Sequence, residues 1–179
     1  MKFAKIISWI IGRCTPEPPS LPMLGNGDLE IWKDAFLSLG KKEISVLEWG
    51  GGSSTTWFPI WLCKKRIKYN WDTIESNVGW YEHIRRQSVE HGLKNVNIHF
   101  AFKRHEYGTL PLSFKRKYDV IIIDGSFRKF CLKRIHLLLK DRGIVIVHDA
   151  NWYRQRLDSD RYLQGKYVGE RTWIAKFKI

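Results

Sequence analysis

Ile44-Ser-Val-Leu-Glu48-Trp-Gly50-Gly-Gly52-Ser-Ser54-Thr-Thr56 is the stretch that decides the fold of this chain. Its first part is β-branched and apolar, as in a buried strand, and it ends in an acidic residue. The three glycines that follow carry no Cβ, so the backbone can turn sharply and approach a ligand closely. Ser53 or Ser54 is suited to cap a helix, whose free N–H groups favour a polar or anionic ligand group. The stretch therefore predicts a strand–loop–helix junction that binds a nucleotide-type ligand.

Two common nucleotide-binding patterns do not fit this junction. A dinucleotide fingerprint needs a third glycine where Thr55 stands, and a phosphate loop needs a Gly-Lys-Ser/Thr run that does not follow here. The order Glu48-x-Gly50-x-Gly52-x-Ser54 instead resembles motif I of the class I S-adenosylmethionine-dependent methyltransferases. In that family an acidic residue precedes G-x-G, and the loop holds the methionine part of the cofactor.

Strand and helix patterns alternate along the rest of the chain. Strands are expected after the first one at 69–75, 96–100, 118–125 and 143–149, and helices at 26–39, 80–91 and 127–139. This alternation predicts an α/β fold, with a doubly wound, mostly parallel, Rossmann-like sheet and helices on both faces. The strand-forming tail, 166–178, would be the antiparallel C-terminal edge strand that the resemblance implies.

Acidic residues gather at one edge of the expected sheet, although the chain is basic. It has 31 Lys+Arg against 18 Asp+Glu, yet the carboxyl ends of four expected strands carry Glu48, Glu75, Asp124 and Asp149. Ligands of open α/β sheets bind at this edge. Any one acid can simply cap the next helix, but the four together suggest a cationic or hydroxyl-bearing ligand. S-adenosylmethionine is both, since it has a sulfonium, an ammonium and a ribose.

The resemblance extends over residues 28–150 and implies a set of site residues. Glu75 would accept hydrogen bonds from both ribose hydroxyls. The cofactor-binding residues would be Glu48, Trp49, Gly50, Gly51, Gly52, Ser53, Ser54, Glu75, Ser76, Asp124 and Gly125. The catalytic candidates are Asp124, His148 and Asp149, which end two buried strands beside the point where a doubly wound sheet changes direction. At the end of the third strand, Ala101-Phe102-Lys103 offers no acid for the adenine.

These residues predict an S-adenosylmethionine-dependent enzyme that O-methylates a small hydroxylated or sugar acceptor. Metal-dependent O-methyltransferases place Asn directly after the second strand-end Asp, whereas Asn151 stands one position later here. We therefore assign no metal ligands and do not favour a divalent metal ion. Two other classes stay open: a non-catalytic methyltransferase-like binding protein, in which Trp49 would block the loop, and a nucleotide-dependent enzyme on the same fold.

The N-terminal region differs from the rest. Residues 1–22 are expected to form a basic amphipathic helix, over 1–13, and a proline-rich linker, while 23–179 form a single methyltransferase-like domain. The helix can lie on an anionic membrane or pack on the fold. Dispersed basic pairs would also suit nucleic acid, a partner that we do not favour. Three widely spaced cysteines indicate neither a disulfide framework nor a zinc site, so we expect a cytoplasmic protein, peripheral to a membrane if the helix binds one.

Overall fold

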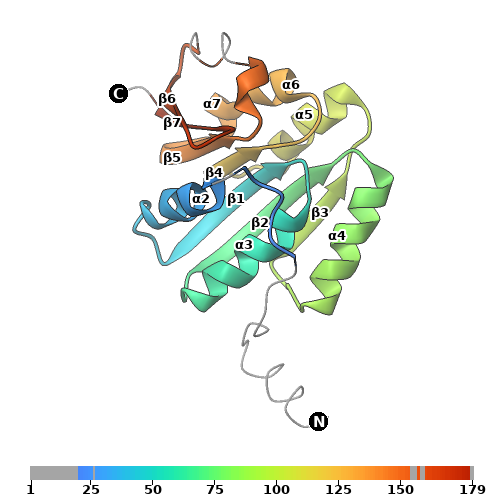
Figure 1. Ribbon diagram of the computed structural model, residues 1–179. Coiled ribbons are helices and arrows are strands. Elements are labelled where there is room, and N and C mark those ends of the chain that lie inside the picture. The colour runs from blue at the N-terminus through green and yellow to red at the C-terminus, as the bar shows by residue number, and fades with distance from the viewer. Residues whose placement is uncertain (1–19, 26, 154–156, 158–159, 178–179) are drawn as a thin grey trace, which may run out of the picture.

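A computed structural model describes residues 20–25, 27–153, 157 and 160–177 (Figure 1). The expected N-terminal helix, 1–13, and most of the linker lie outside the described residues. Among those that are described, no helix is long and apolar enough to cross a membrane.

A seven-stranded sheet forms the centre of the molecule, in the order β3-β2-β1-β4-β5-β7-β6. The first five strands are parallel, and β7 runs antiparallel to both of its neighbours. The strands are β1 (Glu43–Trp49), β2 (Lys68–Glu75), β3 (Val96–Phe100), β4 (Tyr118–Ile123), β5 (Leu139–Val147), β6 (Leu163–Val168) and β7 (Thr172–Phe177). The strand order reverses direction between β1 and β4, which is where open α/β sheets bind ligands.

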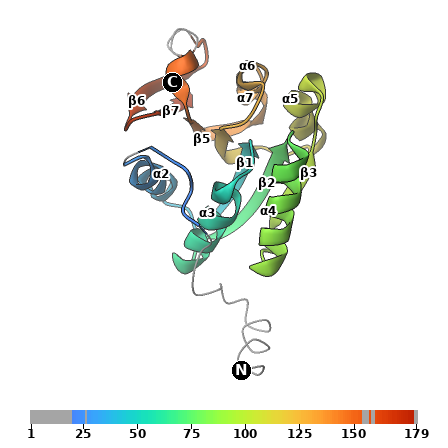
Figure 2. The same cartoon turned by 45° about the vertical axis from the view of Figure 1, so that its right-hand side comes forward.

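Helices cover both faces of the sheet, as the sequence predicts (Figure 2). One face carries α2 (Asp28–Leu37), α3 (Ser53–Lys64) and α4 (Val78–Glu90). The other carries α5 (Arg104–Ser113), α6 (Arg128–Leu132) and α7 (Ile135–Leu138). A short 3-10 helix, η1 (Ala150–Tyr153), follows β5.

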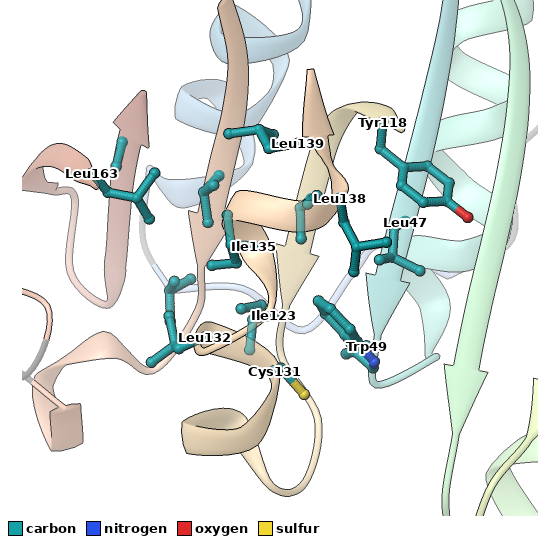
Figure 3. Close-up of a cluster of buried hydrophobic side chains, with 14 of the residues drawn as sticks. Leu47, Trp49, Tyr118, Ile123, Cys131, Leu132, Ile135, Leu138, Leu139 and Leu163 are labelled. Carbon is teal, nitrogen blue, oxygen red and sulfur yellow. The ribbon is translucent and has the colours of Figure 1, made fainter. Parts of the chain in front are cut away.

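The core consists of two apolar layers, because side chains alternate between the faces of each strand. On β4, Val120 and Ile122 pack with the aromatic residues of α2 and α3, while Ile121 and Ile123 pack with α5, α6 and α7. Figure 3 shows the second layer, in which Trp49 and Leu47 of β1 meet residues of α6 and α7. Every residue of β4 is buried, in agreement with its continuous apolar sequence.

The structure differs from the expected elements in two helical segments. Instead of a single helix over 127–139, the chain forms two short helices, α6 and α7, and Leu139 already pairs with Tyr118 at the start of β5. Ile135, Leu138 and Leu139 are all buried in the same apolar layer, so the apolar spacing of this segment fits both a helix and a strand. In addition, Arg104–Ser113 form a helix despite the breaking tendency of Gly108 and Pro111.

The C-terminal segment is a hairpin, not a single strand. Gly169 has a φ of +64° in the turn between β6 and β7, so the tail folds back and β6, not β7, lies at the edge. The antiparallel orientation of the last strand agrees with expectation. The turn is fixed by Asp28 of α2, whose buried carboxylate accepts from the N–H groups of Glu170 and Arg171 at 3.1 and 3.3 Å.

The cysteines also depart from expectation. Cys63 of α3 is disulfide-bonded, although the spacing of the cysteines in the sequence indicated no disulfide framework. Cys131 of α6 is a buried free thiol in the second apolar layer.

Candidate functional site

The loop after β1 is held by direct contact between two glycines. Gly50 has a φ of +96°, and a Cβ built on it would lie 2.2 Å from the backbone nitrogen of Gly125. Gly125 follows β4, and its N–H donates to the carbonyl of Trp49 at 2.7 Å. The β1 and β4 loops therefore pack backbone against backbone, which only glycine permits at these two positions.

The rest of the loop combines a fixed and an open part. A Cβ on Gly51 would lie 2.5 Å from Ile84 Cδ1 of α4, so Gly51 is closely packed. A Cβ on Gly52 would meet no heavy atom within 4 Å. Gly52 is also the N-cap of α3, so the prediction that Ser53 or Ser54 caps this helix is wrong. The loop therefore presents open backbone at Gly52, where a ligand has room to approach.

Glu48 of β1 fixes the position of the glycine loop through hydrogen bonds to the start of α3. Its carboxylate is fully buried and accepts hydrogen bonds from Ser54 Oγ, Thr55 Oγ1, Trp71 Nε1 and Thr73 Oγ1, at 2.6 to 2.9 Å. Burial raises the pKa of Glu48 to about 7, although the four hydrogen bonds act in the opposite direction. These contacts tie the first turn of α3 to β1 and β2, so Glu48 and Ser54 set the position of the loop.

Glu75, at the end of β2, forms the adjacent wall. One carboxylate oxygen accepts from the N–H of Gly51 at 2.8 Å, and the other accepts from the N–H groups of Ser76 and Asn77 at 2.7 and 2.6 Å. Burial raises the pKa of Glu75, the backbone hydrogen bonds oppose the rise, and the charge of Asp124 adds to it. The carboxylate thus links the turn before α4 to the glycine loop. The Ser76 hydroxyl lies 3.3 Å from the hydroxyl of Ser126, which belongs to the loop after β4.

Asp124 and His148 form a hydrogen-bonded pair at the ends of β4 and β5. Asp124 Oδ1 lies 2.9 Å from His148 Nδ1, and behind the ring the buried Asp28 carboxylate is 4.0 Å from His148 Nε2. Burial opposes protonation of His148, but the hydrogen bond to Asp124 and the charges of Asp124, Asp149 and Asp28 together raise its pKa. The Asp124 side chain is 27% exposed, whereas that of His148 is 4% exposed. Asp124 is therefore the member of the pair that can touch an acceptor.

Asp149 is the third candidate catalytic residue, and its backbone is in the strained left-handed region. It has a φ of +49°, and its carboxylate lies 3.5 Å from the Arg171 guanidinium and 3.9 Å from that of Arg128. Arg128 also pairs with Asp124 Oδ1 at 3.2 Å, so it bridges the two carboxylates. A backbone strained in this way is common at functional sites.

The same three residues can hold a metal ion. Ligand atoms of Asp124, His148 and Asp149 lie within 4.8 Å of one another, and they are of a type that divalent metals accept. In this arrangement, however, Arg128 already supplies positive charge between the two carboxylates. The carboxylate and imidazole ligand atoms are therefore of a type that binds a metal ion, but the Arg128 guanidinium occupies the position between the two carboxylates.

Comparison with solved structures identifies the fold. A putative caffeoyl-CoA O-methyltransferase from Staphylococcus aureus superposes with a TM-score of 0.67 at 15% identity, covering 99% of this chain and 91% of that one. A methyltransferase-like protein from Silicibacter pomeroyi gives a TM-score of 0.66 at 16% identity, covering 89% of each chain. This chain has the class I methyltransferase fold. The SAH-bound methyltransferase of Podospora anserina, with a TM-score of 0.64 and 15% identity over 98% of this chain and 87% of that one, agrees. No protein-family model and no curated protein matches the sequence.

Most residues expected at the site of this methyltransferase fold lie at or beside the loop after β1, at the carboxyl edge of the sheet. Gly50, Gly51 and Gly52 form the loop, Glu75 and Ser76 stand beside it, and Gly125 contacts it. The Trp49 ring lies in the core and donates to the carbonyl of Tyr107 at 2.8 Å. The ring therefore does not fill the loop, which weakens the interpretation of the chain as a blocked, non-catalytic protein.

Three residues around the site were not anticipated from the sequence. Arg128 bridges the two candidate carboxylates, Asp28 lies behind His148, and Tyr107 points its hydroxyl at Gly125. A Cβ on Gly125 would lie 2.1 Å from that hydroxyl, which has no hydrogen-bond partner among the described residues. Arg128 stands four positions after Asp124 in the sequence, so its nearness along the chain offered some signal, although α6 begins only at Arg128. Asp28 and Tyr107 come from distant segments and offered none.

Proposed function

We propose that the chain is an S-adenosylmethionine-dependent methyltransferase that acts on a hydroxyl group of a small, sugar-like acceptor. The observation that carries this proposal is the pairing of Asp124 with His148 beside an open glycine loop in a methyltransferase fold. The solved structures of similar fold share little sequence identity with this chain, so they support its fold alone. The proposed activity is therefore argued from the residues of the site.

The residues present fit the cofactor. The backbone of Gly52 is open to a ligand, and Glu75 Oε2, which accepts one backbone N–H, keeps an acceptor position for a ribose hydroxyl. The carboxylates of Asp124 and Glu75 lie close enough for the charge of Asp124 to affect Glu75, and together they would attract the cationic groups of S-adenosylmethionine. When bound, S-adenosylmethionine supplies the methyl group, which passes in line from sulfur to the acceptor oxygen.

Asp124 acts as the general base in this proposal. Its partly exposed carboxylate takes the proton of the acceptor hydroxyl as the oxygen–carbon bond forms, and His148 holds the carboxylate in position through Nδ1. Arg128 keeps Asp124 and Asp149 close together in spite of their like charges. Asp149 would lie beside the acceptor.

A metal-assisted transfer is the second candidate, because the ligand atoms of Asp124, His148 and Asp149 lie within 4.8 Å of one another. A metal ion there would have to displace Arg128 from between the carboxylates. Turnover that stops with a chelator and returns with a divalent ion would identify this alternative.

Calorimetry of the full chain with S-adenosylmethionine and with NAD tests the proposal. We expect binding of S-adenosylmethionine and none of NAD. Glu75→Ala should weaken cofactor binding by about 1.5–3 kcal/mol, the scale of hydrogen bonds to a charged group. Binding of NAD in place of S-adenosylmethionine would show a nucleotide-dependent enzyme on the same fold, and unchanged affinity in Glu75→Ala would remove Glu75 from the site.

A further inference from the structure

Three basic side chains surround one aromatic ring beside the site. The charged groups of Arg104, Arg134 and Lys133 lie 4.4, 5.4 and 5.9 Å from the centroid of the Phe130 ring. Arg104 opens α5, Phe130 belongs to α6, and Lys133 and Arg134 follow α6 directly. In the sequence these cations stand in separate basic pairs, and folding brings them together. We call Arg104, Lys133 and Arg134 the cationic cluster.

The cluster is held in place by close packing of α5 and α6. A Cβ on Gly108 of α5 would lie 3.4 Å from Phe130 Cβ and 3.6 Å from Arg134 Cζ, so the missing side chain lets ring and guanidinium approach the helix. Arg134 also donates to the Phe130 carbonyl at 2.6 Å. The orientation of the ring and of Arg134 is therefore fixed by the fold.

The cluster stands on the same side of the sheet as the proposed site. Because α5 follows β3 and α6 follows β4, both helices begin at the carboxyl edge of the sheet (Figure 1). The glycine loop follows β1 and Asp124 follows β4, so both lie at the same edge. An exposed aromatic residue precedes each helix: Phe102, 65% exposed, stands before α5, and Phe127, 37% exposed, stands before α6. The cluster and Asp124 therefore lie on segments that follow strands at the same edge of the sheet.

Within the described part of the chain, the cluster has no acidic partner. None of the ion pairs there includes Arg104, Lys133 or Arg134. Lys103, the N-cap of α5, adds a further cation at the positive end of that helix and makes no side-chain capping bond. Like charges gathered in this way repel one another, and a bound anion relieves the repulsion.

We propose that the cationic cluster binds a phosphoryl group carried by the methyl acceptor. Three cations match a group with about two negative charges, and two of them are guanidinium groups, which can pair with phosphate oxygens in a bidentate manner. Phe102 and Phe127 offer ring surfaces to the rest of the acceptor. The assignment to the acceptor rests on the proposed methyltransferase function, whereas the binding of phosphate by itself does not.

Calorimetric titration with inorganic pyrophosphate tests the phosphate site directly. Arg104→Gln/Arg134→Gln should raise the dissociation constant by at least about tenfold, the usual effect of losing charged hydrogen bonds. The matched control is Lys65→Gln/Lys68→Gln, which removes the same charge from exposed residues at the amino edge of the sheet and should change binding little. Equal binding by wild type and the Arg104/Arg134 variant, or no binding by the wild type, would overturn the proposal.

Two further measurements separate folding and cofactor effects from phosphate binding. Arg104→Gln alone alters an exposed side chain, so it should keep the wild-type melting temperature and still weaken pyrophosphate binding. All variants should bind S-adenosylmethionine like the wild type. A wild type that binds pyrophosphate through the cluster but no S-adenosylmethionine would refute the proposed function and leave the phosphate site standing.

The source of the phosphate is decided by titrating a phosphorylated monosaccharide and a short uridine oligonucleotide. Loss of monosaccharide binding in Arg104→Gln/Arg134→Gln supports a small acceptor. Loss of oligonucleotide binding alone supports a phosphate site that receives a polymer. Binding of both ligands that survives the substitution would contradict the proposal.

Discussion

Asp124 is the residue on which the proposed chemistry depends, and Asp124→Asn removes its charge while keeping its shape. Turnover should fall by roughly 10²-fold or more, the usual reach of general acid–base help, and S-adenosylmethionine binding should stay largely intact. The pKa of His148 should also fall, because the hydrogen bond and charge of Asp124 raise it against the effect of burial. Kinetics, calorimetry and an NMR titration of the imidazole measure the three effects.

Asp141→Asn is the control for that substitution, since Asp141 is exposed and lies at the opposite end of β5. It should leave turnover and the His148 pKa unchanged. Full activity in Asp124→Asn and in Asp149→Asn alike would leave the general-base assignment without support.

Glu48 predicts a dependence of stability on pH. A carboxyl whose pKa rises from 4.5 to about 7 on folding stabilises the folded state fully only below pH 4.5. That contribution is lost as the pH rises through 7, and its upper limit is about 3 kcal/mol. Glu48→Gln keeps the shape without the ionisation, so urea unfolding at about pH 5 and about pH 8 should show a smaller decrease for the variant than for the wild type. Parallel decreases in the two proteins would mean that Glu48 does not titrate in this range.

At the scale of the elements, the glycine loop allows folding and binding to be separated. In Gly50→Ala, the new Cβ meets the backbone of Gly125 at a positive φ, so the variant should lose several kcal/mol of stability, roughly the scale of strain with overpacking. In Gly52→Ala the Cβ meets nothing, so the melting temperature should change little while S-adenosylmethionine binding weakens. Thermal unfolding and calorimetry distinguish these results. Wild-type affinity in Gly52→Ala would place the ligand away from this loop.

The β6–β7 hairpin shows how an element of the C-terminal segment supports the site from a distance. Its turn donates two backbone N–H groups to Asp28, and the same carboxylate lies behind His148. The hairpin also carries Arg171, which pairs with Asp149. The antiparallel strands are therefore connected to the candidate catalytic group and do more than extend the sheet.

At the scale of the whole molecule, a net charge of +13 favours contact with anionic partners. Residues 1–13, which lie outside the described part of the chain, have the basic amphipathic pattern of a helix that lies on membranes. Deleting them should leave the melting temperature nearly unchanged and abolish co-sedimentation with anionic vesicles. A truncated protein that unfolds would instead show that this segment packs on the fold.

The sequence determined the fold class because its signals are local. The apolar runs of β1, β4 and β5 and the three glycines after Glu48 need no distant partner to be recognised, and they fixed the sheet, the loop and the strand-end acids. Local patterns were insufficient where two structures satisfy the same spacing, as at Leu138 and Leu139, where the chain passes from α7 into β5.

Tertiary structure alone decided which side chains meet. Glu48 and Glu75 are both acidic residues at the carboxyl ends of strands. Packing nevertheless buries Glu48 among four hydrogen-bond donors, whereas Glu75 contacts the backbone of the glycine loop. Asp28 reaches His148, and Arg104 reaches Phe130, across separations of 120 and 26 positions that no sequence period connects. Such contacts depend on how helices pack across strand ends, and that packing is set by the volumes and shapes of the whole core.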